Sequence, residues 1–337
     1  SDWRIKFADQ LGQAELADNW AKSVLGTELP SELQTAPITE RAQTMQAGQQ
    51  RLLQRNKFDP LVEAIGNTKT NLGDFDWFLL LRQAADRNRM VAEVNPEFPE
   101  GGSSVTTAEA QAGLQEIENE GLLPKYNLLA KKVDALVDFN LEEDVKAGLI
   151  SKEQAQESRK KQPFYVPLKG FAADGDMLTA DTDEEAHSDQ RREEAMRAMR
   201  AASPSGSLRE YRQAFGRGSM PFSPTSNLMH DSEQRIRRRT LNKARLPILK
   251  QYKKTPTAFD GVLNVYSYAN PKKVAVGGKT LGGAEYKPLD MEKEYLNPSN
   301  RDKYMLVKDN GVPFYIEFDP SPEGQALRRM FMNMEPK

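Results

Sequence analysis

The sequence predicts a mainly α protein, an elongated multi-helix array with a small C-terminal α+β piece that contains a β-hairpin. In the first part, apolar residues recur at helical spacing, as in Trp3, Phe7 and Leu11, which places such trios on one face of a helix. After Pro256 this spacing gives way to short runs rich in β-branched and aromatic residues, which favour strands. The Asp-Asn-Gly triplet at 309–311 is typical of a hairpin turn.

Local patterns predict where individual helices lie. The segment 72–94 has the clearest helical pattern, with apolar residues early and charged residues late. Thr106 with Glu109, and Ser151 with Gln154, have the spacing of a capping box, so each pair predicts a helix that begins just after its first residue.

The β-rich runs and the last helix follow in order. Short strands are expected at 262–268, 273–276, 304–308 and 314–318, and a closing helix at 323–334. We expect the last two strands to pair through the turn between them.

Composition divides the chain into four predicted segments. We expect a helical domain at 1–171, an acidic mobile excursion at 172–206, a basic helical segment at 207–255 and a small α+β domain at 256–337. The excursion combines runs of Asp and Glu with a Pro/Gly/Ser break and few large apolar residues.

The overall composition excludes several classes of protein. Hydrophobic residues make up 38% and charged residues 28%, which predicts a thin core with much surface. The absence of Cys excludes disulfides and thiolate metal sites. No apolar run approaches the roughly 18 residues that span a bilayer, so we expect a soluble fold. Because the chain begins at Ser1 and stops at Lys337, we expect a fragment or processed piece of a longer protein.

The strongest charge signal is a run of basic residues with no acidic residue among them. It comprises Arg235, Arg237, Arg238, Arg239, Lys243, Arg245, Lys250, Lys253 and Lys254. On a helix such residues can contact phosphates without reading sequence. They can equally pair with the acidic excursion or with an acidic neighbour in an assembly. We favour pairing, because the whole chain has a net charge of -2, whereas dedicated nucleic-acid binders are strongly basic.

Several short patterns resemble catalytic or metal motifs without completing them. The two histidines, His187 and His230, lack the further ligands that a metal site needs. The Gly-Gly-Lys-Thr run at 277–280 lacks the earlier glycine of a phosphate-binding loop. The charged cluster at 86–89 is read as a buried ion-pair network that fixes helix packing, with Arg82 spaced to pair with Asp86. We therefore expect no cofactor, no metal and no enzymatic activity in this chain.

Four short motifs follow one another along the chain. They are the helix Leu80-Leu81-Arg82-Gln83-Ala84-Ala85-Asp86-Arg87-Asn88; the loop Asn95-Pro96 and Gly101-Gly102-Ser103 before the capped helix at Thr106; the turn Ala147-Gly148-Leu149-Ile150-Ser151; and the segment Phe164-Tyr165-Val166-Pro167-Leu168-Lys169-Gly170-Phe171. Their order resembles that in the large polyvalent proteins of phages and mobile elements. The family's His is Gln83 here and its Glu is Asp86, which argues against acid–base chemistry by the first helix.

The resemblance implies a structural segment of a giant internal virion protein of short-tailed phages. Such a protein is ejected into the host with or ahead of the genome and forms part of the DNA-ejection apparatus. The implied partners are other virion or ejection proteins, further domains of the same chain and, non-specifically, phage DNA, in an assembly or oligomer. The implied location is the virion interior, then the host cell envelope or cytoplasm. The alternatives are a non-catalytic segment of a larger virion enzyme, such as a virion RNA polymerase or lytic transglycosylase, and a DNA-gripping module.

Overall fold

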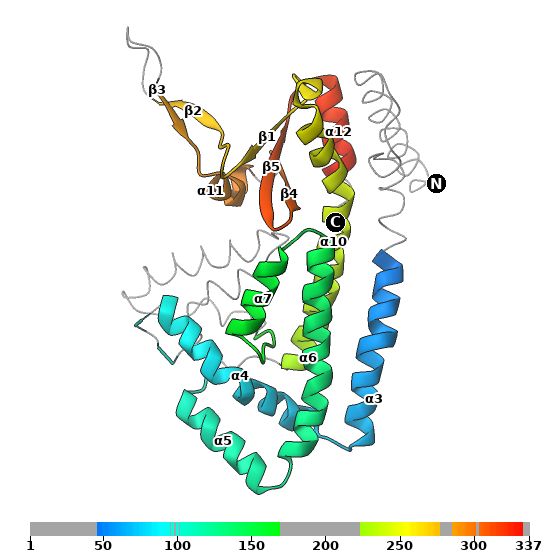
Figure 1. Cartoon of the computed structure of the whole chain (residues 1–337), viewed down its shortest axis with the longest axis vertical. Helices are drawn as coiled ribbons and strands as arrows, with labels where there is room; N and C mark the ends of the chain where they lie inside the picture. Colours follow the sequence, from blue (N-terminus) through cyan, green and yellow to red (C-terminus); the bar gives the residue numbers. More distant parts are fainter. Residues whose placement is uncertain are drawn as a thin grey trace. The chain divides into compact units, whose positions relative to one another are not determined.

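The structure is a computed structural model that describes residues 46–94, 96–97, 99–100, 102–168, 223–276, 285–300 and 303–332. Within these ranges the protein is mainly α-helical with a small C-terminal antiparallel sheet, so the predicted fold class is confirmed (Figure 1). The helices expected before residue 45 and the acidic excursion at 172–206 lie outside the described residues.

The chain forms two compact units. One, which we call the helical unit, comprises the described residues within Gly48–Lys146 and Ser151–Arg237; the other, the sheet unit, comprises the described residues within Ser1–Ala47, Ala147–Ile150 and Arg238–Lys337. The long helix α10, Pro224–Lys254, contributes residues to both. The basic helical segment predicted at 207–255 therefore holds a helix that belongs partly to each unit.

The helical unit is a set of helices joined by short loops. A helix at 46–53 runs through a π-helical turn, η1 (Gln54–Phe58), into α3 (Asp59–Asn67). The helices that follow are α4 (Leu72–Val94), α5 (Thr107–Asn119), α6 (Leu123–Lys146), α7 (Lys152–Lys161) and the first part of α10 (Figure 1). α4 has the bounds that its pattern predicts.

Aromatic residues of α4 and α6 form the centre of the helical unit. The ring of Tyr126 lies 6.1 Å from that of Phe75 and 5.4 Å from that of Phe78, measured between centroids. Leu79 and Val133, from the same two helices, are fully buried. These contacts explain why α4 is apolar early, where it meets α6.

Both predicted capping boxes are confirmed. The Thr106 hydroxyl accepts a hydrogen bond from the Glu109 N–H (3.1 Å), and the Glu109 carboxylate accepts one from the Thr106 N–H (2.7 Å). That backbone hydrogen bond, together with one from the Thr106 hydroxyl, lowers the pKa of Glu109. Ser151 and Gln154 form the same reciprocal pair at the start of α7. Each box satisfies N–H groups that the first helical turn leaves without a helical partner.

The sheet unit contains a three-stranded antiparallel sheet in the order β1-β5-β4. Its strands are β1 (Leu263–Ser267), β4 (Tyr304–Asp309) and β5 (Val312–Phe318). The predicted β4–β5 hairpin is confirmed: Asn310 and Gly311 both have positive φ, 50° and 79°, which suits an Asn-Gly turn.

A separate two-stranded ribbon pairs β2 (Lys273–Val276) with β3 (Glu285–Pro288). Short 3-10 turns, η2 (Pro256–Phe259) and η3 (Pro298–Asn300), and two helices, α11 (Met291–Leu296) and α12 (Pro322–Met332), complete the unit. The second ribbon strand, β3, has no counterpart among the predicted runs.

The sheet is buried on both faces by different partners. On one face Val307 and Ile316 pack with Leu249 of α10 and Phe331 of α12, and all four are fully buried. The other face carries tyrosines, Tyr304 and Tyr315 among them, which pack with Met291 and Tyr295 of α11. Because successive side chains of β4 and β5 point to opposite faces, the two strands contribute to a small apolar layer on each face of the sheet.

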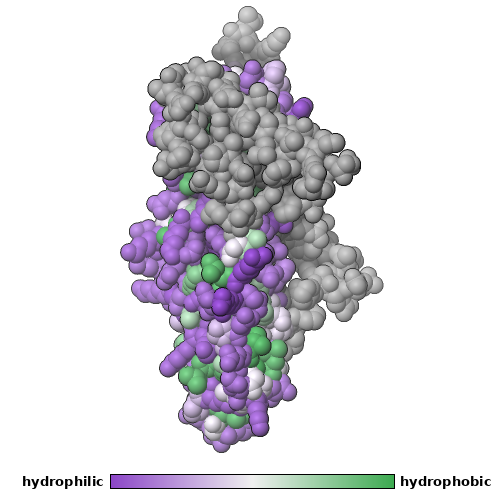
Figure 2. Space-filling model, turned by 90° about the vertical axis from the view of Figure 1, so that its right-hand side faces the viewer, coloured by the Kyte–Doolittle hydropathy of each residue, from purple (hydrophilic) through white to green (hydrophobic). Residues whose placement is uncertain are grey.

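The surface is largely polar, as the composition predicts. In Figure 2 hydrophilic residues predominate over the described part of the face shown, and hydrophobic residues form separate small patches. Isolated apolar side chains of this kind are normal on proteins. In the part of the chain that the structure describes, no helix combines the length and the apolar character that crossing a bilayer requires.

Candidate functional site

The basic residues predicted as a binding surface on α10 differ widely in exposure. Arg235, Arg239 and Arg245 are buried, with exposed fractions of 3%, 2% and 6%. Arg237, Arg238 and Lys243 are half-buried, and Lys250, Lys253 and Lys254 are exposed. The run is therefore not one continuous solvent-facing surface.

Arg235 is held in a buried ion-pair cluster inside the helical unit. Its Nε donates to Asp231 Oδ2 and its Nη1 to Asp144 Oδ2 of α6, each over 2.6 Å. Burial alone would lower the pKa of Arg235, but the two carboxylates outweigh it and hold the pKa above its ordinary value. A charge-assisted cluster of this kind links α6 to α10 and leaves this guanidinium engaged inside the protein.

A neutral amide performs the corresponding role in the sheet unit. Asn242 is 1% exposed. Its Nδ2 donates to the carbonyl oxygens of Ala147 and Lys308, and its Oδ1 accepts from the Lys308 N–H, each over 2.8 Å. One side chain thus joins α10 to the Ala-Gly-Leu-Ile turn and to β4. We call such a contact, in which one buried amide ties distant segments, a polar joint.

The turn also contacts the β4–β5 hairpin directly. The Gly311 N–H donates to the Gly148 carbonyl over 3.0 Å. Gly148 has a φ of +74°, and a Cβ added there would lie 3.4 Å from the Lys308 carbonyl oxygen. A Cβ at that distance makes an ordinary contact, so the conformation rather than the space favours glycine at this position.

A second polar joint connects the Leu80–Asn88 motif with the Phe164–Phe171 motif. Gln83 Oε1 accepts a hydrogen bond from the Val166 N–H over 2.8 Å. Gln83, Tyr165 and Val166 are all buried. Gln83, where the resembling family has His, is here a neutral acceptor that fixes an extended segment against α4.

The third polar joint is Asn88, which organises the loop before α5. Its Oδ1 accepts from the Gly102 and Ser103 N–H groups and from the Ser103 hydroxyl, each over 3.1 Å. Its Nδ2 donates to the Val105 carbonyl and to Glu100 Oε2. A Cβ at Gly102 would lie 2.6 Å from the Arg87 carbonyl oxygen, so only glycine allows the loop to approach α4 this closely.

The charged cluster predicted on α4 contains an ion pair at the protein surface, and Arg82 has another partner than expected. Asp86 pairs with Arg89 over 2.8 Å. The expected pairing of Arg82 with Asp86 is wrong: the Arg82 guanidinium donates to both carboxylate oxygens of Asp134 on α6, over 3.1 and 2.7 Å. A carboxylate on a facing helix can accept two hydrogen bonds from one guanidinium. This bidentate geometry is favoured over an ion pair between Arg82 and Asp86 on the same helix.

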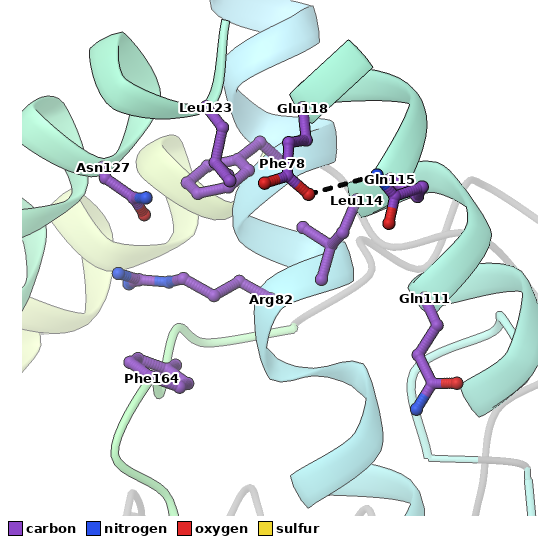
Figure 3. Close-up of a pocket in the computed structure, with 9 residues that line it drawn as sticks. All are labelled: Phe78, Arg82, Gln111, Leu114, Gln115, Glu118, Leu123, Asn127 and Phe164. Carbon is purple, nitrogen blue, oxygen red and sulfur yellow. Dashed lines mark hydrogen bonds between the residues drawn. The ribbon is translucent and has the colours of Figure 1, made fainter. Parts of the chain in front are cut away.

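A cavity of about 450 Å³ lies beside this ion pair in the helical unit (Figure 3). It is lined by Phe78, Arg82, Gln111, Leu114, Gln115, Glu118, Leu123, Asn127 and Phe164. Arg82 lies 4.8 Å from the centroid of the Phe164 ring, and Gln115 donates to Glu118 over 3.1 Å. Its charged groups thus each have a neighbour within the protein.

The remaining sequence candidates are dispersed. His230 is exposed on α10, whereas His187 and the Gly-Gly-Lys-Thr run at 277–280 lie outside the described residues. Across the described ranges, no group of three or more His, Asp and Glu side chains is placed to hold a metal ion. The residues that sequence reasoning missed are the joint amides Gln83 and Asn242, whose only signal is a neutral polar residue among apolar or basic neighbours.

Comparison with known proteins gives no match: no family model, curated protein or solved structure is similar enough to this chain.

Proposed function

We propose that this chain is a structural segment of a giant internal virion protein of short-tailed phages, ejected into the host as part of the DNA-ejection apparatus. The observation that carries the proposal is where the motifs of the resemblance lie. Gln83 and Asn88 from the first motif, Gly102 from the second, Gly148 from the third and Val166 from the fourth all take part in internal hydrogen bonds or close backbone contacts.

These contacts support a scaffolding role because they use the motif residues to fix the fold. The Gln83–Val166 bond joins positions 83 residues apart in sequence, and the Asn242–Ala147 bond joins positions 95 apart. Leaving a buried polar group without its partner costs about 1–3 kcal/mol, so each contact selects one arrangement of its segments. These contacts therefore explain the presence of the motif residues by their role in the fold, without a catalytic role.

The engaged basic residues agree with the same proposal. Arg235 pairs with Asp144 and Asp231 inside the helical unit, and Lys253 pairs with Asp309 over 2.7 Å inside the sheet unit. Some of the basic residues of α10 therefore form ion pairs with acidic residues of the same chain. The proposed partners are other ejection proteins and further domains of a longer chain, within the virion and then in the host envelope or cytoplasm.

The proposal is tested by following the chain through ejection. An antibody raised against the purified chain is applied to genome-filled phage particles and to particles emptied by induced ejection. The proposal predicts that the chain is present in filled particles and absent from emptied ones. Absence from filled particles, or full retention after ejection, contradicts it. An antibody against the major capsid protein serves as the control for recovery.

A further inference from the structure

A basic surface lies on the β2–β3 ribbon, away from α10. Its described residues, 271–276 and 285–288, include three lysines and one glutamate, although the whole chain has a net charge of -2. Lys273 on β2, and Tyr286 and Lys287 on β3, are exposed, and Tyr286 leaves 63% of its surface in solvent. In Figure 1 the ribbon extends from the three-stranded sheet, with α11 near its base. Charge and aromatic surface thus coincide on a projecting element.

The strand register places these residues on the two faces of the ribbon. Lys273 lies opposite Pro288, and Ala275 lies opposite Tyr286. Because residues two apart share a face, Lys273 and Tyr286 belong to one face and Lys287 to the other. One face therefore offers a cation and an exposed aromatic ring, and the second offers a further cation.

A second exposed tyrosine stands at the turn that leads into the ribbon. Ser267 and Asn270 close this turn through reciprocal backbone hydrogen bonds of 3.0 and 3.2 Å. Tyr268, inside the turn, is 96% exposed. An aromatic side chain that is almost wholly in water adds no stability to the fold through burial. Exposed aromatic groups of this kind mark binding surfaces when they cluster with polar ones.

The base of the ribbon is anchored, so its exposed residues are presented from a fixed point. Lys272 Nζ donates to both carboxylate oxygens of Glu317 on β5, over 2.7 and 2.6 Å. The Leu289 N–H donates to the Lys272 carbonyl over 2.7 Å, which closes the ribbon just beyond its strands. Lys272 thus serves attachment, whereas Lys273 and Lys287 face solvent.

We propose that the β2–β3 ribbon and the Tyr268 turn form a binding site for single-stranded nucleic acid. Lysines contact its phosphates, and tyrosines stack on its bases, an interaction that tolerates any sequence. In a duplex the base faces are stacked on one another, so its phosphates can contact the lysines but its bases cannot stack on the tyrosines. Addition of a protein strand to a ribbon edge is disfavoured by lysines on both strands, because edge charge opposes strand pairing.

The experiment measures binding of the full chain to a fluorescently labelled oligothymidine of about 20 nucleotides, longer than a typical single-strand binding site, by anisotropy over a salt series. Three double variants are compared: Lys273→Gln with Lys287→Gln, Tyr268→Ala with Tyr286→Ala, and the control Lys131→Gln with Lys132→Gln, which removes two exposed lysines of α6. A fourth, Lys273→Arg with Lys287→Arg, keeps the charge. Circular dichroism confirms that each variant is folded.

The proposal predicts salt-sensitive binding by the unaltered chain. The Gln variant should lower the slope of log affinity against log salt by about 0.7 for each phosphate that is no longer bound, and the Arg variant should preserve it. The Tyr variant should weaken binding about tenfold or more with little change in slope. The α6 control should bind like the unaltered chain, and an unlabelled duplex should compete poorly.

Three results overturn the proposal. The first is no binding even at low salt. The second is an equal loss of affinity in the α6 control, which would mean diffuse attraction to any lysine. The third is full competition by duplex with no effect of the Tyr variant, which would mean that phosphates alone are bound. None of these results bears on whether the chain resides in the virion, so the scaffolding proposal is tested separately.

Discussion

Two stretches of α10, one in each unit, are held in contrasting ways. In the helical unit, Arg235 binds two buried carboxylates, so the contact depends on charge. In the sheet unit, the neutral amide of Asn242 makes three hydrogen bonds to main-chain groups. A buried ion cluster is costly to break because a charge is left unpaired, whereas removal of an amide leaves only neutral groups without partners. We therefore expect removal of the charged anchor to destabilise the protein more than removal of the neutral one.

The largest effect is expected from removing the charged anchor. Arg235→Met removes a cation that Asp144 and Asp231 bind inside the buried cluster, and should destabilise the helical unit by about 3–5 kcal/mol. Urea-induced unfolding measures this decrease in stability. Lys250→Gln, at an exposed position of the same helix, should change stability by no more than about 0.5 kcal/mol. Equal stability of the two variants would remove the distinction between buried and exposed basic residues.

Removing the neutral anchor should cost less. Asn242→Ala leaves the Lys308 N–H and two carbonyl groups without this partner, and should destabilise the sheet unit by about 1–3 kcal/mol. Hydrogen exchange of the β4 amides reports this destabilisation locally. If Asn242→Ala proves as damaging as Arg235→Met, charge is not what distinguishes the two anchors.

Two glycines provide a matched pair with effects of opposite sign. Gly102→Ala forces a Cβ against the Arg87 carbonyl and should destabilise by about 1–3 kcal/mol. Gly66→Ala, in α3 with nothing within 4 Å of the new Cβ, should stabilise by about 0.4–1 kcal/mol. Thermal or urea unfolding compares them. A Gly102→Ala variant as stable as the unaltered chain would show that the Asn88 loop is not specially constrained.

The smallest effect concerns pH at the same loop. Hydrogen bonds from the Thr107 N–H and hydroxyl and from Asn88 lower the pKa of Glu100 below its usual 4.5. A carboxyl whose pKa is lowered on folding adds stability above its unfolded pKa and loses it as the pH falls through the folded pKa. The stability gap between the unaltered chain and Glu100→Gln should therefore narrow below about pH 4.5. A gap that is constant from pH 7 to strongly acid solution would contradict this.

Local patterns predicted most of the described elements but not which residues pair between them. The capping residues Thr106 and Ser151 and the Asn310–Gly311 turn encode their structure within a few residues, so the sequence predicts them directly. Asp144, the partner of Arg235, lies 91 residues away, and periodicity carries no information about such a pair. The second ribbon strand was missed because Glu285–Pro288 is short and contains proline, which argues against a strand unless it lies at an edge.

The candidate site shows the same division. The basic run was recognised from composition, but its separation into buried and exposed residues follows from packing against α6 and the sheet. Asn242 stood inside that run as an uncharged residue and attracted no prediction. Its role became visible only when the turn at Ala147 and the hairpin at Lys308 were brought to it.

The central claim, that the polar joints and the Gly148 contact fix the fold, is tested most directly by amide hydrogen exchange of the unaltered chain. The amides to follow are those of Ser103, Val166, Lys308 and Gly311, which donate to Asn88, Gln83, Asn242 and Gly148 respectively. The account predicts that all four exchange as slowly as amides in the interiors of α4 and α10. Exchange at the rate of unprotected loop amides would contradict it.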